Sequence, residues 1–375
     1  MSLLPTPISS SRRQHYRKPS VADLDPHEFW RRATAYISSR SRVSHILVLL
    51  LTICLLFLFA VNIRSTRFDP TAVTSTQRPV DIFDIFNVLE KEIVRPEATQ
   101  QLQHLIIVPG HGIWLGGPGE SVYNESTWAL ETYQRGDGSA SRISAFISHI
   151  RKGIELATDD EESLLVFSGG STRSSTPMTE AISYKSLAMA LDLFPPAEQP
   201  GSSLYERATT EDYALDSFQN LLFSVARFRE VTGHYPTRVT IVGYAMKHRR
   251  YEELHRKALR WPLDSEYWKY YGIDMEDEEE RERAIEGEIE NGYKPYETDL
   301  YGCHGTLLEK RRLRNVHHRA HPYFTSAPEL AELLAWCPKG TLEPPVAGLG
   351  EDYYSPEESA KAYRTIFKGP LPWDR

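Results

Sequence analysis

The sequence predicts an α/β fold with a doubly wound, mainly parallel sheet, preceded by a single transmembrane helix. Short apolar, β-prone runs alternate with amphipathic stretches of helical spacing between residues 105 and 259. Such alternation favours parallel strands joined by right-handed helical crossovers. A separate uncharged apolar run at residues 46–63 is long enough to cross most of a bilayer core of roughly 30 Å.

The N-terminal region predicts a type II membrane anchor. Residues 1–45 are rich in serine and arginine, as expected for a disordered cytosolic tail, and residues 64–100 form a predicted stalk. Because basic residues mark the cytosolic side of a span, everything after about residue 64 should be lumenal. A cleaved signal peptide is the alternative, but the basic region is long and no small-x-small cleavage site follows the span. The short span favours the thinner membranes of the endoplasmic reticulum or Golgi.

Two expectations follow from a lumenal location. Asn124 lies in an Asn-Glu-Ser sequence and is a candidate glycosylation site. Cys303 and Cys337 are in a compartment that permits a disulfide, whereas Cys54 lies within the span.

The predicted α/β domain occupies residues 101–262, and its elements alternate along the chain. Apolar periodicity and turn signals place strands at 105–108, 164–167 and 239–242, and helices at 143–154, 177–193, 213–230 and 247–259. The second helix is expected to begin at Pro177 with Thr176 as its cap.

Residues 263–375 are predicted to be a charged elaboration that packs on this domain. An acidic stretch at 274–290 and a basic one at 310–319 are expected to be solvated surfaces. Alternatively, the two pair with each other, or the basic stretch overhangs an anionic ligand. The sequence predicts no metal site, and His317, His318 and His321 are interpreted as part of the basic stretch.

Composition and missing motifs exclude several functions. A formal charge of −8 and a pI near 5.9 argue against a nucleic-acid partner, which would require a basic face. The chain contains no phosphate loop, no G-x-G-x-x-G after the first strand, no G-x-S-x-G elbow and no H-E-x-x-H pair. No D-x-D follows a strand, which weakens a glycosyltransferase interpretation. Nothing in the sequence identifies a protein partner.

Polar residues gather at the ends of the predicted strands, where a doubly wound sheet binds ligands. The glycine amides of 168–172 could hold a small anionic ligand, and Glu211 is the candidate acid or base beside it. Helical spacing places Ser217 and Asn220 on one side of a helix. The remaining candidates in these strand-end loops are Gly110, His111, Gly112, Ser168, Gly169, Gly170, Arg173, Lys247 and Arg250.

Four ordered blocks carry a resemblance to a known family: VPGHGI, FSGGSTR followed by Glu180 and Tyr184, EDYALDSFQN, and VGYAMKHRR. Together they resemble the domain-of-unknown-function 218 family, the YdcF-like domains, over roughly residues 103–260. The resemblance implies a Rossmann-like domain with a pocket for a nucleotide-like or S-adenosylmethionine-like ligand, in a family whose reaction is unsettled. It also implies that Glu180 belongs to the site.

Two departures from the family pattern leave catalysis open. Gln219 stands where many members have a second glutamate, and Lys247 replaces the usual histidine. One hypothesis is an enzyme that acts on a small phosphorylated or nucleotide-like ligand. The others are a non-catalytic ligand-binding or scaffold protein of secretory membranes, and a diverged transferase.

Overall fold

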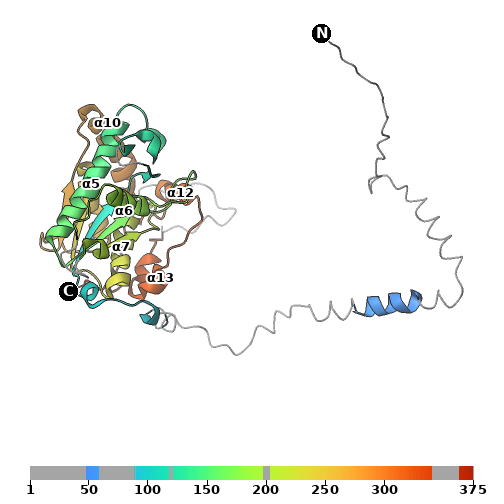
Figure 1. Ribbon diagram of the computed structural model, residues 1–375. Coiled ribbons are helices and arrows are strands. Elements are labelled where there is room, and N and C mark those ends of the chain that lie inside the picture. The colour runs from blue at the N-terminus through green and yellow to red at the C-terminus, as the bar shows by residue number, and fades with distance from the viewer. Residues whose placement is uncertain are drawn as a thin grey trace, which may run out of the picture. The chain divides into compact units, whose positions relative to one another are not determined.

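The computed structural model describes residues 48–58, 88, 90–117, 121–196, 203–339 and 363–374 (Figure 1). The chain divides into two units, Met1–Pro79 and Val80–Arg375. In the first unit the structure describes one exposed helix, at 48–58, within the predicted span. Across the described residues, no helix is both long and apolar enough to cross a membrane. The predicted tail and most of the predicted stalk lie outside the described residues.

The second unit is built on a five-stranded sheet with the order β5-β4-β1-β6-β7, in which every neighbouring pair is parallel. The strands are β1 (His104–Pro109), β4 (Ser163–Ser168), β5 (Ala208–Glu211), β6 (Arg238–Gly243) and β7 (Trp268–Gly272). From β1 the chain adds β4 and β5 on one side and then β6 and β7 on the other. The direction of winding therefore reverses at β1, which makes the space beyond the ends of β1 and β6 the expected ligand crevice.

The three strands expected from apolar runs are present, and two more were missed. β1, β4 and β6 are almost wholly buried, as continuous apolar runs predict for central parallel strands. β5 reads Ala-Thr-Thr-Glu and β7 reads Trp-Lys-Tyr-Tyr-Gly, so neither has an apolar run. Both are edge strands, which bury less side-chain surface and leave a weaker sequence signal.

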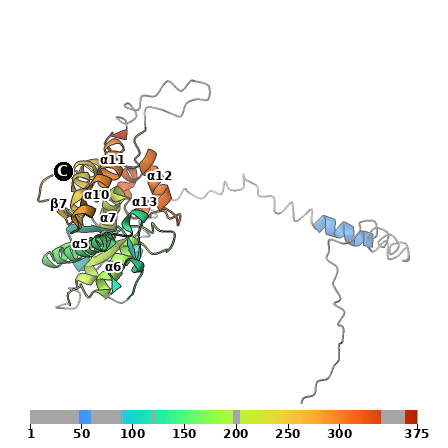
Figure 2. The same ribbon diagram turned by 90° about the horizontal axis from the view of Figure 1, so that it is seen from above.

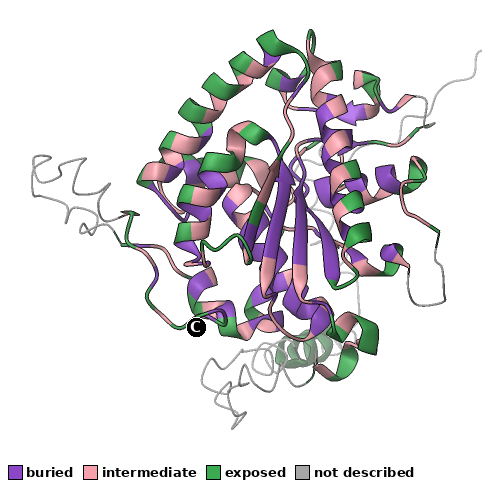
Figure 3. Ribbon diagram, turned by 90° about the vertical axis from the view of Figure 1, so that its left-hand side faces the viewer, coloured by how far each residue is buried: buried purple, intermediate pink, exposed green. Residues whose placement is uncertain are grey.

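Helices cover both faces of the sheet. Alternate strand residues feed two cores: Ile106 and Leu165 pack with α5 (Ser139–Asp159) and α6 (Glu180–Ala190), and Ile107 and Val166 pack with α7 (Ser217–Thr232). Figure 3 shows the buried residues concentrated on the central strands between the two helical layers. Figure 2 shows α5 and α6 away from the C-terminal helices α11 (Lys294–Thr298) and α12 (Gly305–Arg314), which belong to the α7 side.

The starts of α6 and α7 lie three and four residues after the predicted ones, and α5 begins at Ser139, four residues before its predicted start. α6 begins at Glu180, because the Thr179 hydroxyl accepts a hydrogen bond from the Ile182 amide, and not at Pro177 with Thr176 as cap. α7 begins at Ser217 after the Asp216 cap. In both cases several residues could serve as a cap, and the turn after the preceding strand decides between them.

The predicted helix at 247–259 is a chain of short turns: η6 (Ala245–Lys247), α8 (His248–Arg250), the π-helical η7 (Tyr251–His255) and α9 (Arg256–Ala258). The remaining short elements before β7 are α4 (Glu97–Gln100), β2 (Ile113–Trp114), η3 (Glu125–Thr127), β3 (Trp128–Ala129), η4 (Thr132–Gln134) and η5 (Leu204–Arg207). β2 and β3 form a separate antiparallel pair. Residue 95, within the predicted stalk, already contacts α7, because Arg95 Nε donates to the Glu230 carbonyl at 2.9 Å.

The C-terminal segment belongs to the same folded unit. It supplies β7 to the sheet and large buried side chains, among them Tyr301, Tyr323 and Trp373, to the α7-side core. Its other elements are α10 (Glu278–Glu288), the π-helical η8 (Ile289–Tyr293), α13 (Tyr323–Ser326), η9 (Pro328–Leu330) and α14 (Ala331–Leu334). The segment is thus part of the core as well as a charged surface.

Candidate functional site

A cavity of about 840 Å³ lies beyond the carboxyl ends of the strands, between the α/β core and the C-terminal helices. Its volume is in the range typical of small-molecule sites, roughly 300–1,000 Å³. The core contributes the loops after β1, β4 and β6 and the start of α7, and the other wall comes from α10, η8, α11 and α12. Of the residues predicted from sequence, the cavity brings together Gly110, His111, Arg173, Glu180, Ser217, Asn220, Lys247 and Arg250.

His111 and Lys247 meet where the winding of the sheet reverses. Lys247 Nζ lies 3.4 Å from His111 Nδ1, and the imidazole stacks on Tyr244 with ring centroids 4.9 Å apart. Burial, followed by the charge of Lys247, holds the pKa of His111 well below its ordinary value, so the imidazole is neutral. Burial and the nearby Arg250 lower the pKa of Lys247 to about 8. Lys247 therefore changes charge close to neutral pH.

Arg173 and Arg250 are held in place by carboxylates. Arg250 Nε lies 3.2 Å from Glu288 Oε1 of α10, and both side chains are buried. Arg173 pairs with Glu131 at 3.0 Å and lies 3.8 Å from Glu180. These pairs fix the guanidinium groups at the cavity wall.

Glu180 joins the loop after β4 to the start of α6. One of its oxygens accepts a hydrogen bond from the Thr172 hydroxyl at 2.7 Å. Its side chain also fills the space beside two predicted glycines: an added Cβ would lie 2.5 Å from Glu180 Cβ at Gly110 and 2.7 Å from Glu180 Oε2 at Gly169. Gly169 moreover has φ +151°, which side chains rarely adopt.

The two glycine amides of the expected anion cradle are engaged within the protein. The Gly169 amide donates to the Glu211 carbonyl at 2.9 Å, and the Gly170 amide donates to the Ala214 carbonyl at 2.7 Å. Ser168, Gly169 and Gly170 do not line the cavity. Glycine is required at these two positions because the turn packs tightly against Glu180 and the loop after β5. The Gly-Gly sequence therefore indicates close packing and not contact with a ligand.

Glu211 and Gly112 also lie away from the cavity. Glu211 is the last residue of β5 and is fully buried. Its carboxylate accepts hydrogen bonds from the Ser168 hydroxyl at 2.8 Å, the Tyr213 amide at 2.8 Å and the Tyr323 hydroxyl at 3.1 Å. Burial raises the pKa of Glu211 to about 7 against these hydrogen bonds. Glu211 therefore titrates near neutral pH, but its carboxyl group lies in the core and does not face the cavity.

Asn220 connects the cavity to this buried network, and Ser217 connects it to the buried His255. Ser217 Oγ lies 2.8 Å from His255 Nε2, and Asn220 Oδ1 accepts from the Ser168 hydroxyl at 2.9 Å. Gln219, where the family pattern has a second glutamate, accepts from the Leu215 amide at 2.9 Å and does not line the cavity. It stabilises the turn before α7.

The sequence interpretation missed several cavity residues. The most important are Arg142 of α5, Glu280 and Glu288 of α10, and Lys310 and Arg314 of α12. Glu280 and Glu288 belong to the acidic stretch at 274–290 and Lys310 and Arg314 to the basic stretch at 310–319, whereas Arg142 had no signal in the sequence. The two charged stretches pair with the core: Glu280 and Glu288 of α10 pair with Arg142 and Arg250, and Arg311 of α12 pairs with Asp216.

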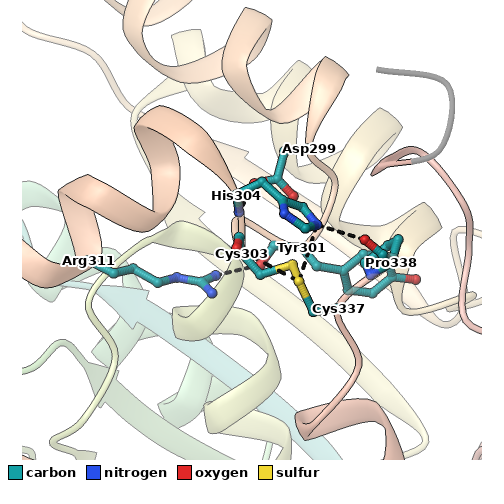
Figure 4. The surroundings of a disulfide bond; sticks show 7 residues. All are labelled: Asp299, Tyr301, Cys303, His304, Arg311, Cys337 and Pro338. Atoms are coloured by element: carbon teal, nitrogen blue, oxygen red, sulfur yellow. Dashed lines mark hydrogen bonds between the residues drawn. A yellow bond between two sulfur atoms is a disulfide. The ribbon is translucent and has the colours of Figure 1, made fainter. Parts of the chain in front are cut away.

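Cys303 and Cys337, the expected pair, form a disulfide in the structure (Figure 4). The His304 imidazole lies beside it, 3.2 Å from Cys337 Sγ, and Nε2 also contacts the Pro338 carbonyl at 2.7 Å. Atoms of these three side chains lie within 4.8 Å of one another, as in a metal site. Because the two sulfurs are bonded to each other, they are not thiolate ligands.

The predicted glycosylation site is exposed, and the basic stretch contacts the core. Asn124 is exposed at the start of η3, where its side chain accepts from the Ser126 amide at 3.0 Å. His317, in the basic stretch, contacts the carbonyls of Arg173 and Thr176 at 3.1 and 3.0 Å. It thus ties this stretch to the loop after β4.

Comparison with known proteins gives one relative of undefined function. The chain is similar to uncharacterized protein YOR238W of Saccharomyces cerevisiae, with 34% identity over 123 residues. The matched region is 31% of this chain and spans about two fifths, 40%, of the yeast protein. No protein-family model and no solved structure matches the chain.

Proposed function

We propose that this chain is a membrane-anchored enzyme of the early secretory pathway whose lumenal, YdcF-like and Rossmann-like domain acts on a small phosphorylated or nucleotide-like ligand. The observation that carries the proposal is the cavity at the reversal of the sheet, lined by cationic side chains from both of its walls. Such a crevice is where doubly wound domains bind nucleotides. A ligand of the S-adenosylmethionine class fits the volume, but the excess of cations favours an anion.

The chemistry of the site centres on Lys247. In its charged form Lys247 attracts an anionic group beside the fixed guanidinium groups of Arg173 and Arg250. With a pKa of about 8 it can also release a proton near neutral pH, and the neutral His111 imidazole, 3.4 Å away, holds its amino group in place. Glu180 orients Thr172 and lines the wall, and Glu211 supports the loop from beneath.

A non-catalytic binding protein is the second candidate, and one observation favours it. Glu211, the expected acid or base, is buried in a hydrogen-bonded network outside the cavity. Without Glu211 as an acid or base, the cavity can bind an anion without transforming it.

Substitution of Lys247 tests the proposed function. The full-length protein is purified, and small molecules that co-purify with it are identified by mass spectrometry. We expect Lys247→Met to weaken binding of that compound about ten- to hundredfold, because it removes a charge-assisted contact. Binding to the parent protein should also weaken as the pH rises through about 8, where Lys247 loses its charge.

Lys247→Arg separates the two candidates. Arginine keeps the charge at every pH but cannot release a proton, so an enzyme should retain binding and lose turnover of the compound. Lys257→Met, at an exposed lysine outside the cavity, is the matched control. Turnover by neither the parent nor the variant would support the binding protein, and unchanged affinity in Lys247→Met would rule out the cavity as the site.

A further inference from the structure

The cavity wall contributed by α12 presents two cations on one face. Lys310 and Arg314 are four residues apart in this helix, so their side chains are neighbours, and both line the cavity. They lie outside the region that resembles the YdcF-like family. Across the cavity, the loop after β6 presents Lys247.

Among the described residues, these three cations form no ion pair with a carboxylate, unlike the other cations of the cavity. Arg142 and Arg283 pair with Glu280, Arg250 with Glu288, and Arg173 with Glu131. By contrast, Lys310 Nζ donates to the Asn291 carbonyl at 2.6 Å, and an Arg314 amino group donates to the Leu215 carbonyl at 2.8 Å. Lys247 contacts only the neutral His111 within hydrogen-bond range. Each is therefore held by a neutral partner and not by an ion pair. Glu288 acts on both lysines and Glu180 on Lys247 without pairing with them, and the pKa of each lysine is still lowered.

These cations repel one another across the cavity. Burial, then Arg314 and Arg250, lowers the pKa of Lys310. Burial, then Arg250, with a further contribution from Arg314, lowers the pKa of Lys247. Cations from both walls thus influence each other, which places them around a common space. Crowding of like charges costs stability, and an anion with several charges would relieve it.

We propose that the ligand carries a diphosphate, with one phosphate held by Lys247 of the core and the other by Lys310 and Arg314 of α12. This inference rests on the proposed function and specifies its ligand class. One phosphate would leave the cations of one wall without an anionic partner, whereas two linked phosphates supply an anionic group for each wall. The four tyrosines that also line the cavity, Tyr133, Tyr244, Tyr251 and Tyr296, offer apolar ring surface to the rest of the ligand.

Calorimetric titration of the full-length protein with inorganic pyrophosphate and with orthophosphate tests the inference. We expect pyrophosphate to bind at least tenfold more tightly, and ADP more tightly than AMP to the same degree. Lys310→Gln and Arg314→Gln should each weaken pyrophosphate binding about tenfold or more, with a smaller effect on orthophosphate. Arg312→Gln, an exposed position on α12 outside the cavity, should bind like the parent.

The possible failures point to different conclusions. Equal affinity for the one-phosphate and two-phosphate ligands, or parental pyrophosphate binding in both α12 variants, would overturn the diphosphate assignment and leave an anion site on the core. Absence of binding for all four ligands would overturn the proposed function as well. Thermal melting of each variant checks that it is folded, and Lys310→Met repeats the test if Gln destabilises α12.

Discussion

At the end of β5, the Glu211 carboxylate is surrounded by donors from three segments of the chain: Ser168, Tyr213 and Tyr323. The sequence placed Glu211 just before a predicted helix, but because β5 was not predicted it could not show whether the side chain faces the cavity or the core. That choice depends on Tyr323, more than a hundred residues away, which no local pattern connects to β5. His111 and Lys247 were easier to place, because both follow central strands.

Glu211 should make stability depend on pH. Its folded pKa, about 7, lies above the ordinary value of 4.5, so the folded state holds the proton more tightly than the unfolded state. The stabilisation is therefore fully present below about pH 4.5 and is lost as the pH rises through about 7. Between pH 5 and 7.5 the loss from this one group should be about 2 kcal/mol.

Glu211→Gln removes this titration while keeping the shape of the protonated acid. Urea unfolding of the parent and variant at pH 5 and pH 7.5 gives the difference directly, and the contributions of other groups cancel. We expect the parent to lose about 2 kcal/mol more than Glu211→Gln over this range. Glu206→Gln, at an exposed glutamate, controls for loss of a charge. An identical pH dependence in parent and Glu211→Gln would show that Glu211 is ionised in the fold.

Among the elements, central strands and long helices were predictable and edge elements were not. β4 and α5 can be recognised in the sequence, because buried positions require apolar residues at the spacing of a strand or a helix. β7 lies at the sheet edge beside charged sequence, and its pairing with β6 is set by the sheet and not by its own composition. The π-helical turns η7 and η8 likewise have no local signature.

The disulfide next to α12 is the element-scale feature with the clearest energetic consequence. It joins residues separated by 34 positions, and closing a loop of that length in the unfolded chain is worth about 3–4 kcal/mol in the entropic model. We therefore expect the free energy of unfolding of the Cys303→Ala, Cys337→Ala double variant to be lower by that amount. The variant should then unfold at a lower urea concentration than the parent. Reductant should destabilise the parent to a similar degree and leave the variant unchanged.

Thiol labelling provides the check on the disulfide. Native and urea-unfolded parent protein, without reductant, should each expose no thiol other than Cys54. Labelling of all three cysteines in unreduced protein would contradict the pairing, and an equal response of parent and double variant to reductant would contradict its contribution to stability.

For the whole molecule, the overall charge concealed an opposite local arrangement. The chain is acidic, with a formal charge of −8, yet seven basic and five acidic side chains line the cavity. The overall composition therefore argued against a nucleic-acid partner but could not locate the surface that binds a small ligand. The cavity depends on α10 and α12 meeting the core, and their ion pairs with Arg142, Arg250 and Asp216 connect residues far apart in the sequence.

The membrane topology remains a prediction from the sequence, and it constrains where this cavity operates. Because the basic residues precede the apolar run at 46–63, a C-terminal tag on the full-length chain should be lumenal. In sealed microsomes, protease should digest an N-terminal tag and spare the C-terminal one until detergent is added.

Glycosylation of Asn124 gives a second test in the same vesicles. If the domain is lumenal, glycosidase should increase the electrophoretic mobility of the parent, and Asn124→Gln should abolish this shift, because Asn124 is exposed. Digestion of the C-terminal tag without detergent would place the cavity and the Cys303–Cys337 pair on the cytosolic side, where glutathione keeps cysteines reduced. The orientation and the disulfide are therefore tested by separate measurements, and a lumenal location of the domain predicts the outcome of both.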